Sequence, residues 1–291
     1  MISSKAQQGP PLSRKTVVAR HPFLTMCLIS SVLLSTPIMA QDKQSAPSEQ
    51  AAQGSHPDLS GFWNLSFTPT PDQALLAKLP PDTAVLADSG VPEFPQGEYG
   101  GLKVKPDALA AAKRWKPSDE MTVSRTCATP SVIYSIQGPF PFEIYQTPQL
   151  IVFKYEYFDM VRIIFMDGRS HPPADAPHSK TGHSIGHWEG DELVIDTTHL
   201  EPATITNNGL DHSDQVHMIE RYKLSSDHKT LMATQWFEDP KVLDNNGARY
   251  IEWSAKPGQH VFPYDCDPSF GLSYQAHEKK PATAPRAKRR R

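Results

Sequence analysis

The stretch TGHSIGHWEGDELVIDTTHL, residues 181–200, decides the fold of this chain. Two strand-like runs flank Gly190 and Asp191, and a Gly-x pair in that position is typical of a two-residue hairpin turn. We therefore expect antiparallel strands at residues 183–189 and 192–198, paired outward from the turn. Every position on one strand then has a defined partner on the other.

The two faces of this predicted hairpin differ in chemistry, because side chains alternate along a strand. One face carries Ser184, Gly186, Trp188, Leu193, Ile195 and Thr197. The other face carries His183, Ile185, His187, Val194, Asp196 and Thr198. Gly182-x-Ser184-x-Gly186 also fits the nucleophile elbow of hydrolases, which needs a strand that turns sharply into a helix. No helix is predicted after Ser184, so we expect a structural serine. A serine hydrolase that uses His217 from the Trp188 face is the alternative.

The rest of the chain after Gly138 repeats the strand pattern, with runs rich in Val, Ile, Phe and Tyr. The further predicted strands are Phe142–Gln146, Gln149–Tyr157, Phe158–Met166, Gln215–Leu224, Thr230–Glu238 and Tyr250–Lys256. Their links are too short for helical crossovers, so neighbours should be antiparallel. The fold class predicted is mainly β, an antiparallel meander that forms a barrel or a sandwich. A Pro-rich N-terminal segment holds one or two short helices, around Asp72–Lys78 and Pro106–Trp115.

The chain ends predict export and one folded domain. Residues 1–40 begin with basic residues and continue into an apolar run, which indicates a cleaved secretory signal and a periplasmic or secreted protein. A membrane anchor is the alternative, but Pro37 and several Ser interrupt a run that is short for a span, so we expect no stable membrane insertion after cleavage. We expect a flexible linker at 41–57, a single β-rich domain at 58–275 and a disordered basic tail at 276–291.

The cysteines and the charge distribution narrow the kind of protein and the partners that it can bind. Removal of the signal leaves Cys127 and Cys266, and an even count in an exported chain predicts a bridge, with two free thiols as the alternative. Residues 1–40 and 279–291 hold eleven of the 29 basic residues and none of the 32 acidic ones, so the part between carries a net charge near −14. An acidic body is a poor binder of nucleic acid.

Two resemblances accompany this pattern. Gly61-Phe62-Trp63 at the start of the first strand resembles the Gly-x-Trp of lipocalin-like barrels. From about Pro57 to Cys266 the chain is similar to a family of secreted bacterial proteins with DGR-HP, GHS-GHWEGD-LV-DT and ER-Y motifs. These motifs are residues 167–172, 182–197 and 220–222 here. The resemblance implies the fold boundaries and export, and it assigns no catalytic residue.

Histidine and carboxylate on one hairpin face point to acid–base chemistry. His183 and His187 lie about 13 Å apart along a strand that rises ~3.3 Å per residue, so they cannot chelate one ion alone. Asp196 lies diagonally between them, where it would orient an imidazole and raise its pKa. We predict His183, His187, Asp196 and His217 as catalytic residues. No cofactor is predicted; a metal site assembled from distant residues stays open, and a solvated polar face is the non-functional alternative.

Loops and neighbouring strands supply candidate groups for substrate binding. The predicted set is Arg169, His171, His212, Arg221 and Glu220. Arg162 and Glu220 each interrupt an apolar strand face. Either they pair with each other, or Arg162 stacks on Trp63 as in lipocalin-like barrels, or Glu220 serves as a pocket acid. The predicted function is binding of a small organic molecule in a pocket lined by His and carboxylates, with acid–base catalysis of the lyase, isomerase or hydrolase type. A non-catalytic lipocalin-like carrier is the alternative.

Overall fold

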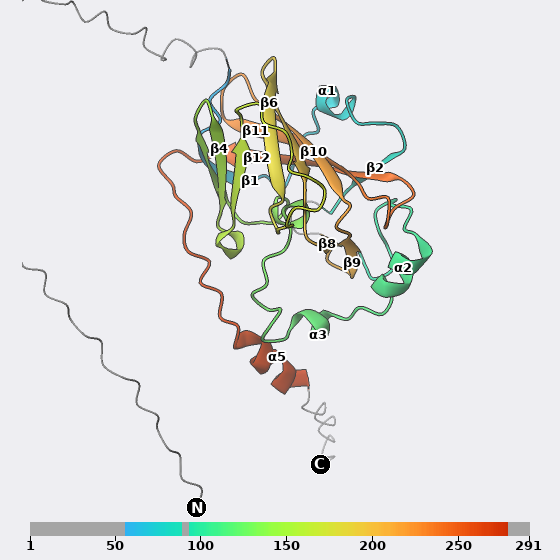
Figure 1. The fold of residues 1–291 in the computed structure, drawn as a ribbon. Helices are drawn as coiled ribbons and strands as arrows, with labels where there is room; N and C mark the ends of the chain where they lie inside the picture. Colours follow the sequence, from blue (N-terminus) through green and yellow to red (C-terminus); the bar gives the residue numbers. More distant parts are fainter. Residues whose placement is uncertain (1–55, 89–92, 279–291) are drawn as a thin grey trace, which may run out of the picture. The chain divides into compact units, whose positions relative to one another are not determined.

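Nine strands close into a barrel in the computed structural model, which describes residues 56–88 and 93–278 (Figure 1). In order around the barrel they are β1 (Gly61–Leu65), β3 (Phe142–Gln146), β4 (Leu150–Tyr155), β5 (Val161–Phe165), β6 (His183–Glu189), β7 (Glu192–Thr198), β10 (His217–Leu224), β11 (Thr230–Glu238) and β12 (Asn246–Ala255). Pairing of Trp63 with Ala255 joins β1 to β12 and closes the ring. The mainly β fold class is confirmed, and the barrel rather than the sandwich is the form it takes. The predicted signal and most of the predicted linker and tail lie outside the described residues.

Two strand pairs depart from the antiparallel pattern. β5 runs parallel to β6, and β2 (Thr83–Leu86) adds parallel to the first half of β12. A separate antiparallel pair consists of β8 (Ala203–Thr206) and β9 (Leu210–His212). The β5–β6 pair is parallel because the long connection from Asp167 to Gly182 brings the chain back alongside β5, so that β6 begins beside β5 and runs in the same direction.

Five short α-helices and one 3₁₀ turn accompany the barrel in the described ranges. They are α1 (Gln73–Leu76), α2 (Pro106–Ala112), α3 (Pro117–Glu120), α4 (Val132–Ser135), η2 (Tyr157–Asp159) and α5 (Phe270–Glu278). The two predicted helices correspond to α1 and α2. The predicted strands around Tyr157 stop short, because Phe158 turns the chain with φ of 54°. Within the described ranges, no helix has the length and apolar character to cross a membrane.

The β6–β7 hairpin forms with the predicted register. Glu189 pairs with Glu192, and the pairing continues to His183 with Thr198. Gly190 supplies the φ of +63° that begins the two-residue turn, a conformation that a side chain would strain. The hairpin therefore fixes which side chains enter the barrel.

Two clusters of buried apolar side chains hold the fold together. The first fills the barrel and includes Trp63, Phe153 and Trp253. Gly186 belongs to its wall, since a Cβ there would lie 2.5 Å from the Met166 sulfur. The second lies between α2, α4, β8, β9 and the adjoining strands, and it includes Ile133. The barrel interior is thus packed with side chains.

The predicted disulfide is present. Cys127 and Cys266 are bonded, with Cα atoms 5.8 Å apart and 139 positions apart in sequence. The bond ties the segment before α4 to the segment that follows β12. Closing a loop of that length contributes about 5 kcal/mol in the chain-entropy model.

Candidate functional site

The inner face of the hairpin meets a buried arginine. Arg162 on β5 is fully buried and donates hydrogen bonds to Ser184 Oγ at 3.0 Å and Thr197 Oγ1 at 2.7 Å. It also pairs with Glu220 Oε2 at 2.5 Å, and the Tyr222 hydroxyl donates to the other Glu220 oxygen at 2.9 Å. The predicted pairing of Arg162 with Glu220 is confirmed. Glu220 lies in the barrel core, so its prediction as a substrate-binding residue is wrong.

This inner cluster excludes the elbow geometry for Ser184. The residue is fully buried within β6, where the strand continues to Glu189 without turning into a helix, and it shares a hydrogen bond of 2.9 Å with Thr197. Its side chain points away from His183 and Asp196, as the alternation predicted. Burial lowers the pKa of Arg162, but the Glu220 carboxylate outweighs burial and the net shift is upward. The arginine stays charged, and the cluster is a structural ion pair within the core.

On the outer face of the same hairpin, two of the predicted histidines lie against the Asp196 carboxylate and a third contacts one of them. His217 Nε2 lies 2.8 Å from Asp196 Oδ1, in hydrogen-bond geometry. His171 Nε2 lies 3.2 Å from the same oxygen without that geometry, while His171 Nδ1 shares a hydrogen bond of 2.9 Å with His183 Nδ1. His217 Nδ1 also lies 3.5 Å from Glu238 Oε1. We call His183, His171, Asp196 and His217 the histidine row.

The strand register explains why these residues meet. His183 is opposite Thr198 on β7, and Thr197 is opposite Met218 on β10, so Thr198 and His217 come next in line. His183 on β6 and His217 on β10 are separated by two strand spacings of ~4.8 Å each. The imidazole of His171, brought by the loop that follows β5, occupies the space between them. Asp196 therefore takes its partners from β10 and the loop, and the predicted partners on β6 were wrong.

The pKa values of the histidine row are pushed apart. The hydrogen bond that His217 donates to the Asp196 carboxylate raises the pKa of His217 against the opposing effect of burial. Burial lowers the pKa of His183, and electrostatic repulsion from the neighbouring His171, His199 and Arg169 side chains lowers it further. For Asp196, burial would raise the pKa, but the contacts with His217 and His171 produce a net lowering. One end of the row favours the imidazolium form and the other end favours neutral imidazole.

A groove opens beside this row. It has a volume of about 440 Å³ and lies between the loop after β5, the end of β7 and the start of β10. Its lining includes His171, His178, Thr198, His199, Gln215 and His217. The His199 imidazole fixes the loop by contacting Pro173 O at 2.9 Å and Thr198 Oγ1 at 2.8 Å. His217 and His171 thus face a preformed hollow on the outer wall of the barrel.

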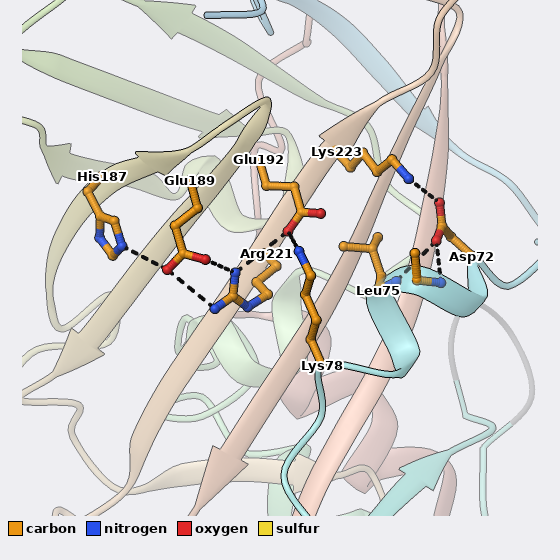
Figure 2. A network of polar contacts seen from close by, with 9 residues as sticks. Asp72, Leu75, Lys78, His187, Glu189, Glu192, Arg221 and Lys223 are labelled. Atoms are coloured by element: carbon orange, nitrogen blue, oxygen red, sulfur yellow. Dashed lines mark hydrogen bonds and ion pairs between the residues drawn. The ribbon is translucent and has the colours of Figure 1, made fainter.

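Two predicted site residues belong to a separate network at the hairpin tip (Figure 2). His187 Nε2 contacts Glu189 Oε1 at 3.2 Å, and its side chain is 59% exposed. Arg221 pairs with Glu189 at 2.6 Å and with Glu192 at 3.6 Å. The Arg221 hydrogen bond, assisted by His187, lowers the pKa of Glu189 to about 2. The structure therefore does not bring His187 or Arg221 to the histidine row.

Two more predicted residues, Arg169 and His212, do not line the groove. Arg169 pairs with Asp167, and its guanidinium lies 3.7 Å from the centre of the Phe165 ring, which stacks in turn on His183. His212 is buried against Ser131 Oγ at 2.8 Å, and burial lowers its pKa to about 4. Arg169 acts on His183 only through its charge and the shared aromatic ring, and His212 is a core residue.

Sequence reasoning missed several groove residues. His178, His199, Gln215 and Glu238 contact the groove or His217 but were not predicted as site residues. The density of histidine between positions 171 and 217 was the available signal. In the described ranges, no group of three or more His, Cys, Asp or Glu side chains is arranged to hold a metal ion.

Comparison with known proteins adds no assignment. The chain matches no protein-family model. It also matches no curated protein sequence at a significant level. The function must therefore be argued from the groove itself.

Proposed function

We propose that the groove beside the histidine row is an acid–base site for a small organic molecule. His217 gives and takes the proton, and Asp196 orients its ring. The hydrogen bond of 2.8 Å between His217 Nε2 and Asp196 Oδ1 carries the proposal. A carboxylate that holds an imidazole at the edge of a hollow, with a raised pKa, is the arrangement that general acid–base catalysis uses.

The location of the ligand follows from packing. Trp63, Phe153, Tyr222 and Trp253 fill the barrel interior, and the Arg162–Glu220 pair occupies more of it. The outer groove, at about 440 Å³, falls within the range of ~300–1,000 Å³ that is usual for ligand sites. Its lining supplies imidazole, hydroxyl and amide groups that suit a small polar molecule.

We also propose that the protein is exported to an oxidising compartment. The disulfide between Cys127 and Cys266 supports an oxidising compartment, as do the apolar run near the N-terminus and the resemblance to secreted bacterial proteins. The acidic body disfavours nucleic acid as a partner.

The test compares turnover by matched variants. Wild-type protein, His217→Gln and His187→Gln are incubated with a panel of small esters, lactones and enolisable ketones in deuterated buffer. Hydrolysis, isomerisation and deuterium incorporation are then measured by mass spectrometry. Loss of a general acid–base group should reduce the rate about 10²- to 10⁴-fold in His217→Gln, while His187→Gln keeps the wild-type rate.

A carrier gives a different pattern in the same assay. If panel compounds bind but are not converted, or if His217→Gln converts them as fast as wild type, the acid–base proposal is wrong. Binding that weakens in His217→Gln without any turnover would favour the carrier alternative.

A further inference from the structure

A second hollow lies at the barrel mouth, where the strand wall is incomplete. β5 pairs with β6 only at Ile164 with Ser184 and at Phe165 with Ile185. β5 ends at Phe165, whereas β6 continues to Glu189. The last four residues of β6 therefore have β7 on one side and no strand on the other within the described chain.

Hairpin geometry identifies which backbone groups face that open side. In a two-residue hairpin, Glu189 and Glu192 exchange both backbone hydrogen bonds, and every second pair does the same. The backbone groups of Gly186 and Trp188 consequently point away from β7. The parallel ladder uses the Gly186 N–H, which leaves the C=O of Gly186 and both backbone groups of Trp188. Across the ranges that the structure covers, none of these three groups has a hydrogen-bond partner.

The open edge faces a hollow of about 710 Å³. Its lining also includes Met166, Thr147, Pro148 and Asp58. Trp188 supplies an apolar surface on which the His56 ring stacks, with ring centres 4.9 Å apart. We call this space the β6-edge slot.

We infer that the β6-edge slot binds an extended peptide segment of a separate molecule as an added strand. Addition of a strand satisfies edge backbone groups through main-chain hydrogen bonds, while alternate side chains supply specificity. Here one side chain would meet Trp188 and Met166. The exposed carboxylate of Asp58 also lines the slot, on a body with a net charge near −14, and it favours a basic side chain in the peptide. The peptide class that fits alternates apolar and basic residues.

Fluorescence anisotropy with labelled peptides on the full chain tests this inference. The probe is Ac-TVKVKVT-NH2, with Ac-TVEVEVT-NH2 as its charge-reversed partner. The lysine peptide should bind, and the glutamate peptide should bind at least about tenfold more weakly. N-methylation that blocks the backbone N–H groups of one peptide edge should weaken binding about tenfold, the value of one backbone hydrogen bond, whereas N-methylation of the other edge should not.

Matched protein variants locate the site. Asp58→Asn should weaken binding of the lysine peptide several-fold, while Asp191→Asn, at the exposed hairpin turn, should leave binding unchanged. Hydrogen exchange of the Trp188 backbone amide should slow when the peptide binds, which reports on the edge without any substitution.

Three outcomes overturn the inference. One is absence of binding by the lysine peptide up to about 1 mM, an affinity of about −4 kcal/mol. Another is binding that responds to neither N-methylation nor Asp58→Asn. The third is stronger binding after deletion of residues 279–291, because the chain's own basic tail would then be the occupant instead of a separate peptide.

Discussion

The two faces of the β6–β7 hairpin place polar groups in opposite environments. On the inner face, Ser184 and Thr197 are fully buried and both bond to Arg162. On the outer face, Asp196 and His217 keep about a third of their side-chain surface exposed, at 35% and 31%. The inner groups are closed to any ligand, and among their polar atoms the buried Arg162 Nη1 has no hydrogen-bond partner in the described ranges, whereas His217 on the outer face borders a groove. Polar residues at neighbouring positions are thus buried in an ion-pair cluster on one face and remain accessible to small molecules on the other.

The largest expected effect comes from breaking the inner pair. Glu220→Gln removes the charge that compensates Arg162, and loss of one partner of a buried ion pair costs about 3–5 kcal/mol of unfolding free energy. Asp196→Asn, the matched change on the outer face, should cost no more than about 1 kcal/mol, because partly exposed pairs contribute little. Urea denaturation at neutral pH measures both. Equal losses would remove the distinction between the faces.

Removal of a single hydroxyl from each face, at Ser184 and at Thr198, compares the two faces on a smaller scale. Ser184→Ala should cost about 1.5–3 kcal/mol, since a buried hydrogen bond from a charged group is lost. Thr198→Ala, on the outer face, should change stability by about 0.5–1.5 kcal/mol, the range for a neutral hydrogen bond. Ser184 should also resist a fluorophosphonate probe, and stoichiometric labelling of Ser184 would contradict its burial.

The pair of His217 and Asp196 on the outer face should make the stability of the protein depend on pH. Because folding raises the pKa of His217, its contribution to stability is present below its unfolded value near 6.5 and is lost as the pH rises through the folded value. Because folding lowers the pKa of Asp196, its contribution is present above 3.8 and is lost as the pH falls through the folded value. The stability difference between wild type and His217→Gln should therefore be largest between about pH 4 and 6.5, and reach at most about 1 kcal/mol. A difference that grows above pH 8 would be inconsistent with the pair.

The smallest effect concerns the hydrogen bond between His171 and His183. One imidazole must donate and the other accept, so the bond is lost when both are protonated. As the pH falls through the lowered pKa of His183, amide hydrogen exchange in residues 172–178, corrected for the intrinsic pH dependence of exchange, should increase about two- to tenfold, as expected for one net hydrogen bond. His187→Gln should keep this increase, and His183→Phe should abolish it. If the corrected exchange rate of these amides in wild type does not change with pH, the His171–His183 hydrogen bond does not hold the loop.

The hairpin and its two faces could be predicted because Gly190-Asp191 fixes the register and alternation does the rest. The same reasoning predicted the pairing of Arg162 with Glu220, since both interrupt apolar faces. The partners of Asp196 could not be predicted, because they depend on which strand follows β7 around the barrel and on where a long loop places His171. The parallel pairing of β5 with β6 was missed for the same reason. Helix α4 was missed because its residues, Val-Ile-Tyr-Ser, carry a strand-like composition.

The titration of His217 tests the central claim most directly. Histidine side-chain resonances are followed by NMR from pH 4 to 9 in wild type and in Asp196→Asn. His217 should titrate above 6.5 and His183 below it in wild type, and Asp196→Asn should lower the pKa of His217. If His217 and His183 titrate together, or if Asp196→Asn leaves the His217 pKa unchanged, the outer face is a solvated polar surface without an acid–base pair.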